Sequence, residues 1–149
     1  MTIQLLASAA RTSSGNSGVL AQTNFSSVRA ATFWLELTNA ATDAGDSLDV
    51  YLQHSYDGGT SWSDFVAFTQ ILGNGADTLN FEAQWSEDPS ALTALVSEHA
   101  VTDATLSAGS VLHGPTGPDW RIKWVVVDGG AANATFTFGV KARLLRRRR

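Results

Sequence analysis

The sequence predicts an all-β protein, an antiparallel β-sandwich of jelly-roll-like form with one short helix. Apolar and polar residues alternate with a period of two in several segments, which is the pattern of a half-buried strand. Gly, Asp and Asn clusters separate these segments and indicate turns. No helical units alternate with the strands, so a sandwich is favoured over a parallel α/β sheet.

The stretch 48–72 gives the strongest local signal, because two strand-like runs flank Asp57-Gly58-Gly59. Asp-Gly between such runs is typical of a β-hairpin. Asp128-Gly129-Gly130 gives the same signal near the C-terminus, so we expect a second hairpin between 119–127 and 134–145. All the strands expected after residue 30 are 31–38, 48–53, 65–72, 78–84, 110–113, 119–127 and 134–145.

The chain of 149 residues is expected to form one folded domain over 31–145. Residues 1–30 have little periodicity and are predicted to be a loosely structured arm with one or two weak strands. The expected helix spans 88–98, where Asp88 can cap it and Pro89 suits its first turn. Residues 146–149 form a basic C-terminal tail.

The predicted hairpin turn at Asp57-Gly58-Gly59 also carries the pattern Ser55-x-Asp57-x-Gly59-x-x-Trp62. It resembles the Asp-box of sialidases and related propellers, in which the Ser and Asp bond turn amides and the Trp packs beneath the turn. The resemblance covers eight residues and implies a structural turn. A sialidase-like site would also need clustered arginines, and residues 1–140 contain three arginines spread along the chain. The motif therefore predicts a fold feature and not a reaction.

We predict no catalytic, cofactor-binding or metal-ligating residues. Cysteine is absent, so disulfides and thiolate sites are excluded. His54, His99 and His113 lack metal-ligand spacing, and the loop with Asp43, Asp46 and Asp49 lacks the calcium-loop pattern. No apolar run approaches the ~20 residues of a membrane span. An enzyme is therefore not expected.

Charge is divided unevenly along the chain. Residues 1–140 contain four basic and all fourteen acidic residues, whereas the last nine positions contain six basic residues. We expect Arg146, Arg147, Arg148 and Arg149 to bind an acidic protein surface or to form a solvated end. Nucleic acid is disfavoured because the acidic body would be repelled.

Outward-facing aromatic residues are the other candidates for an interaction. Trp34 lies on the polar register of its predicted strand, and Tyr51 does so in the next one. An exposed aromatic on a sandwich face can stack a sugar or can mark a subunit interface. The sequence leaves both alternatives open.

Four segments together resemble small structural proteins of tailed bacteriophages: SAARTSSGNSG at 8–18, LDVYLQHSYDGGTSW at 48–62, PDWRIKWVVV at 118–127 and ATFTFGVKARLL at 134–145. The resemblance implies a non-enzymatic virion component. It favours a decoration or cement protein on the capsid exterior that binds the major capsid protein, with a homotrimer as the favoured assembly. A neck or tail component and a carbohydrate-binding sandwich module are the alternatives.

Overall fold

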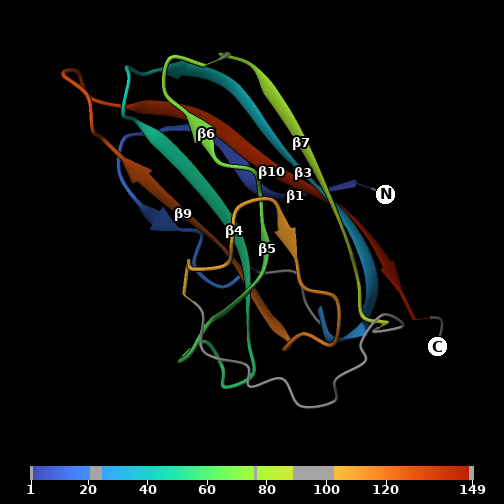
Figure 1. Cartoon of the computed structure of the whole chain (residues 1–149). Coiled ribbons are helices and arrows are strands. Elements are labelled where there is room, and N and C mark those ends of the chain that lie inside the picture. The colour runs from blue at the N-terminus through green and yellow to red at the C-terminus, as the bar shows by residue number, and fades with distance from the viewer. Residues whose placement is uncertain (1, 21–24, 76, 89–102, 148–149) are drawn as a thin grey trace.

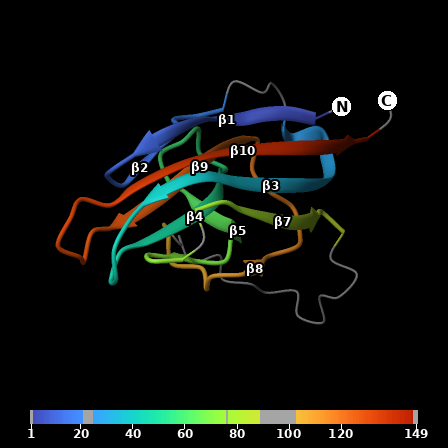
Figure 2. The same cartoon turned by 90° about the horizontal axis from the view of Figure 1, so that it is seen from above.

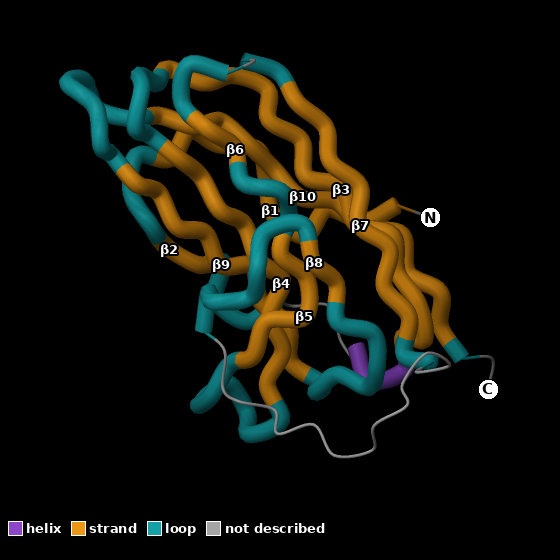
Figure 3. Tube along the Cα trace, in the orientation of Figure 1, coloured by secondary structure: helices purple, strands orange, loops and turns teal. Residues whose placement is uncertain are grey.

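In the computed structural model, two antiparallel sheets pack face to face, which confirms the predicted all-β sandwich (Figures 1 and 3). The structure describes residues 2–20, 25–75, 77–88 and 103–147. Sheet A contains, in spatial order, β1 (Thr2–Arg11), β10 (Thr135–Arg146), β3 (Val28–Ala41) and β7 (Leu79–Ser86). Sheet B contains β2 (Gly15–Asn16), β9 (Asp119–Val127), β4 (Ser47–Ser55), β5 (Ser63–Ala67) and β8 (Ser110–Val111), and β6 (Ile71–Leu72) also pairs with β4.

The order of the strands is that of a jelly roll. When the short strands β6 and β8 are set aside, the orders β1-β10-β3-β7 and β2-β9-β4-β5 become 1-8-3-6 and 2-7-4-5 in chain order. Such a double-sheet arrangement interleaves strands that are distant in sequence. Figure 2 shows β1, β10, β3 and β7 following one another across sheet A in this order. The jelly-roll-like topology is thus confirmed.

The core lies between the sheets and is built by the alternation that the sequence displays. Phe33, Leu35 and Leu37 of β3 are fully buried, as are Phe136 and Phe138 of β10. Sheet B contributes inward side chains of the same kind, namely Leu48, Val50, Leu52, Trp120 and Ile122. Each strand therefore presents one apolar row to the opposite sheet.

The N-terminal segment contains the strands that were predicted as weak, β1 and β2, but it belongs to the sandwich and is not a separate loose arm, because residues 2–11 form an edge strand of sheet A. β1 pairs antiparallel with β10 through a register that shifts twice, between Gln4 and Leu6 and between Leu6 and Ala9. As an edge strand it buries Leu5 alone among its own residues. The bulges disturb the period of two, so the sequence pattern there is weak.

The second predicted hairpin is also wrong. β9 pairs with β4 in sheet B, whereas β10 pairs with β1 and β3 in sheet A. The loop between them crosses from one sheet to the other, so their apolar rows face each other across the core instead of lying side by side. A turn signal marks where the chain reverses but does not say which strand it will join.

The central hairpin of β4 and β5 forms as expected, although residues 56–62 make a longer connection than a two-residue turn. The helix predicted at 88–98 falls almost entirely outside the described residues. A 3-10 helix at Phe25–Ser27 (η1) was not predicted. Its Phe25 is buried in the core and stacks on Trp120. Among the described residues no helix is both long and apolar enough to cross a bilayer.

Candidate functional site

The structure brings together the four residues of the Asp-box-like pattern in the loop between β4 and β5. The Ser55 hydroxyl donates to Asp57 Oδ1 at 2.7 Å and accepts from the Gly59 amide at 2.9 Å. Asp57 Oδ1 accepts from the Ser61 amide, and Trp62 Nε1 donates to the Gly59 carbonyl at 2.9 Å. Gly59 has φ +88° and lies against the Trp62 ring, so a side chain there would be strained. The side chains of Ser55, Asp57 and Trp62 thus all make hydrogen bonds within the turn.

The contribution of this turn to the stability of the fold depends on pH through the Asp57 carboxylate. Hydrogen bonds from the Ser61 amide and then from the Ser55 hydroxyl lower the pKa of Asp57 to about 2. The folded pKa lies below the ordinary value of about 3.9, so the charged form stabilises the fold above about pH 4 and this contribution is lost as the pH falls through about 2. Asp57→Asn should therefore lower the urea midpoint at neutral pH, and its difference from wild type should shrink in acid. A difference that does not change with pH would contradict this account.

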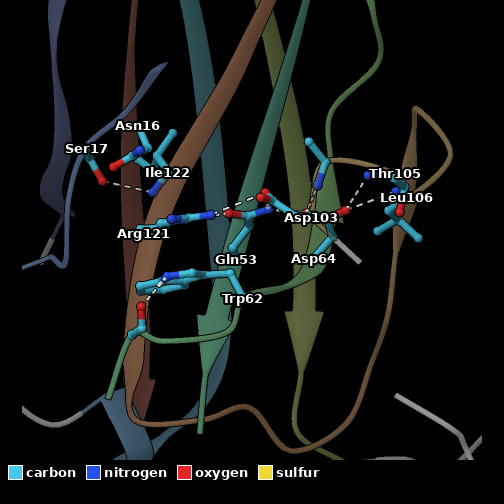
Figure 4. Close-up of polar contacts among 12 residues, drawn as sticks. Asn16, Ser17, Gln53, Trp62, Asp64, Asp103, Thr105, Leu106, Arg121 and Ile122 are labelled. Atoms are coloured by element: carbon cyan, nitrogen blue, oxygen red, sulfur yellow. Dashed lines mark hydrogen bonds and ion pairs between the residues drawn. The ribbon is translucent and has the colours of Figure 1, made fainter. Parts of the chain in front are cut away.

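A buried polar network on the outer side of sheet B centres on Asp64 (Figure 4). Its two carboxylate oxygens accept hydrogen bonds from three consecutive loop amides, at Ala104 (3.1 Å), Thr105 (2.8 Å) and Leu106 (3.0 Å). Gln53 Nε2 donates to Asp64 Oδ1 at 2.6 Å. Ala104 has φ +58°, an unusual value for a residue with a side chain. Asp64 therefore fixes the shape of the loop at 103–106 over the sheet.

Arg121 extends the network toward the Asp-box-like turn. Its Nε donates to Gln53 Oε1 at 2.6 Å, its Nη2 pairs with Asp103 at 3.2 Å, and its guanidinium lies 4.4 Å from the centre of the Trp62 ring. Burial lowers the pKa of Arg121, while Asp103 acts in the opposite direction. The guanidinium thus links the turn, strand β4 and the loop in one rigid unit.

This network was missed at the level of sequence, although a signal existed. Gln53 and Asp64 interrupt apolar strands, and they are cross-strand partners in the register of β4 and β5. Buried polar side chains require partners, which makes such interruptions informative. Their other partners, Arg121 and the loop at 103–106, lie too far along the chain to be inferred from spacing.

Two of the three aspartates at 43–49 bind the connection between β9 and β10. Asp46 Oδ1 accepts from the amides of Gly129 and Gly130, and Asp43 Oδ2 accepts from those of Ala131 and Ala132. A hydrogen bond from the Asp43 amide is the largest cause that lowers the pKa of Asp46. In the described part of the chain no three His, Cys, Asp or Glu residues are placed to hold a metal ion. These carboxylates cap backbone amides.

Two histidines accept backbone hydrogen bonds and the third lies outside the described residues. His54 is buried, and its Nδ1 accepts from the Gly117 amide at 3.1 Å. His113 Nδ1 accepts from the Ser86 amide at 3.1 Å. His99 falls in the undescribed range.

The two candidate aromatics differ sharply in environment. Trp34 is half-buried on the outward register of β3, where its cross-strand neighbours are Lys141 and Glu82. Its Nε1 donates to Glu82 Oε2 at 3.0 Å, which fixes the ring on the outer face of sheet A. Tyr51 is only 7% exposed, and burial is the first cause that raises its pKa. The expectation of an exposed Tyr51 is therefore wrong, because the outer side of β4 is itself covered.

The C-terminal arginines begin at Arg146, the last residue of strand β10. Arg146 is exposed and pairs in register with Val28. Arg147 binds Glu87 through Nε (3.2 Å) and Nη2 (3.0 Å), and its amide donates to the Ser27 carbonyl at 2.9 Å. Arg29 shares the same carboxylate at 3.2 Å. Arg148 and Arg149 lie outside the described residues. Arg147 is thus attached to the sandwich.

A search against models of known protein families and a search of curated proteins both find no match to this chain.

Proposed function

We propose that this protein is a non-enzymatic virion component, a decoration or cement protein that binds the major capsid protein on the exterior of a phage head as a homotrimer. The observation that carries the proposal is the basic end of β10. Arg147 is bound to Glu87 and Ser27, so the arginines start from a fixed point on an otherwise acidic body. Such a cluster suits carboxylates on a neighbouring protein.

The rigidity of the loops is a second support. Asp43, Asp46, Asp57 and Asp64 accept amide hydrogen bonds from loops on both sheets. A protein without cysteine gains order in its loops by this means, and preorganised loops reduce the entropic cost of binding. The jelly-roll order also occurs in viral capsid and lectin domains, although fold alone does not assign a function.

The direct test mixes purified protein with capsids that lack it and measures bound copies against free concentration. Saturation at a number that matches the sites of the capsid lattice is expected, because a cement protein repeats with the lattice symmetry. Saturation at a few copies at one vertex would indicate a neck or tail component instead. No binding to capsids would overturn the proposal.

Truncation after Leu145 tests the role of the arginines. The shortened protein should bind capsids more weakly than wild type at low salt. As salt is raised, the affinity of wild type should fall toward that of the shortened protein, because salt screens exposed ion pairs. Deletion of Met1 and Thr2, at the other terminus, is the control. Equal affinity of the truncated and complete proteins at low salt would remove the arginines from the interface.

A carbohydrate-binding module is the second candidate, and the position of Trp34 favours it. The indole lies on the open face of sheet A beside hydrogen-bonding side chains of Glu82, Gln84 and Lys141. A flat aromatic surface with polar neighbours is suited to a sugar ring. Binding to a glycan panel that is lost in Trp34→Ala, without binding to capsids, would select this candidate.

A further inference from the structure

A groove of about 570 Å³ lies near the ends of β3, β7 and β10 in sheet A, apart from the network on sheet B. Arg143, Thr32 and Gln84 are consecutive cross-strand neighbours on the outward register of these strands. The next row contains Leu145, Ala30 and Ser86. His113 completes the wall from the loop after β8. The small side chain of Ala30 between larger neighbours leaves the surface hollow there.

The polar side chains that line this groove can all donate a hydrogen bond. Arg143 is exposed and makes no ion pair with any described residue. His113 Nδ1 accepts from the Ser86 amide, so a neutral imidazole carries its proton on Nε2 and can donate from there. Gln84 and Thr32 add an amide and a hydroxyl. None of the described residues that line the groove is acidic, although the chain contains fourteen acidic residues.

A second hollow of about 650 Å³ adjoins the first and shares Leu145 with it. Its wall has three arginines (Arg29, Arg146 and Arg147) and one carboxylate, Glu87. Glu87 binds both Arg29 and Arg147, so it balances only part of their charge. The two hollows meet at Leu145 and together make a basic strip along the end of β10.

We propose that this strip, which we call the β10 groove, binds an extended acidic segment of a partner protein. The inference rests on the proposed function and identifies where the partner binds. Two hollows joined at an aliphatic residue suit a peptide, whose carboxylates meet Arg143 and the arginines around Glu87 while its aliphatic carbons contact Leu145 and Ala30. A nucleic acid carries one negative charge for about every 1.7 Å of duplex and would be repelled by the remaining acidic body.

Fluorescence anisotropy with labelled hexaglutamate tests the groove without any capsid. Arg143→Gln should weaken binding by about threefold to tenfold, as expected for the loss of one exposed charge-assisted contact. Lys123→Gln, which removes the same charge from sheet B, should leave the affinity within about twofold of wild type. Amide shifts of Thr32 and Gln84 in the NMR spectrum should report the bound peptide.

Equal weakening by the two variants would reduce the binding to general electrostatics and overturn the proposal, as would absence of hexaglutamate binding. Tighter binding of an oligothymidylate that also depends on Arg143 would assign the groove to nucleic acid instead. An oligomer that dissociates in Arg143→Gln would assign the groove to a second copy of this chain.

If wild type and Arg143→Gln bind capsids equally, the groove proposal fails while the capsid proposal stands. If hexaglutamate binds as expected and capsids do not bind, the capsid proposal fails while the groove remains a site for acidic peptides.

Discussion

Replacement of Asp64 by alanine is expected to lower the free energy of unfolding by about 3–5 kcal/mol, because it removes at once the acceptor of the buried Gln53 carboxamide and of three loop amides. The side chain is 2% exposed and accepts from three loop amides and from Gln53 Nε2. Without it the amides at 104–106 must find water or remain unpaired. Gln53 is fully buried and cannot turn to solvent. Urea unfolding monitored by tryptophan fluorescence measures the loss.

Two further variants separate the hydrogen bonds from charge. Asp64→Asn keeps the shape but turns one acceptor into a donor that faces backbone amides, so it should lose about 1–3 kcal/mol. Asp128→Asn changes the same charge at an exposed position and should stay within about 0.5 kcal/mol of wild type.

Hydrogen exchange locates the effect. The amides of Thr105 and Leu106 donate directly to Asp64 Oδ2, so they should exchange faster in Asp64→Asn, whereas amides of β10 should change less. A loss below about 1 kcal/mol in Asp64→Ala would mean that water replaces the carboxylate and that the loop is held elsewhere.

The sequence predicted strands well where one face is buried and the other is not. The expected strand 119–127 coincides with β9, and the alternation at 134–145 follows β10 to within a residue at each end. These strands have a neighbour on both sides, so their inward rows are uniformly apolar. The edge strand β1 has bulges and buries one residue, which explains why its pattern was too weak to recognise.

Pairing between strands was the part that local pattern could not supply. In a jelly roll, β10 lies between β1 and β3, more than ninety positions away along the chain, and its turn with β9 leads to the other sheet. Similarly, Asp64 meets Ala104 across 40 positions, and Arg121 meets Gln53 across 68. The Asp-box-like turn was predictable because the hydrogen bonds that shape it lie within eight residues. Contacts between distant segments depend on topology, which a single sequence does not reveal.

Replacement of Trp120 by alanine should have a comparable effect, a loss of about 3–5 kcal/mol. Trp120 is fully buried, and its ring stacks on Phe25 at 4.3 Å between centroids. Phe65 lies at 4.9 Å and Trp85 at 5.7 Å, so the ring joins η1 to both sheets. Its truncation leaves a cavity among rigid aromatic neighbours that cannot collapse easily. Urea unfolding measures the loss, and near-ultraviolet circular dichroism reports the altered packing.

Conservative and surface variants make the Trp120 result specific. Trp120→Phe keeps the stacking but removes the Nε1 donor that binds the Gly117 carbonyl at 3.1 Å, so it should lose less than alanine, about 1–3 kcal/mol. Trp34→Ala removes a tryptophan from the outer face of sheet A and should lose no more than about 1 kcal/mol, because that ring is only half-buried and lies outside the core. If Trp34→Ala destabilised the protein as much as Trp120→Ala, the outer face of sheet A would be part of a packed interface between subunits. That result would favour the oligomeric form of the capsid proposal over a glycan site at Trp34.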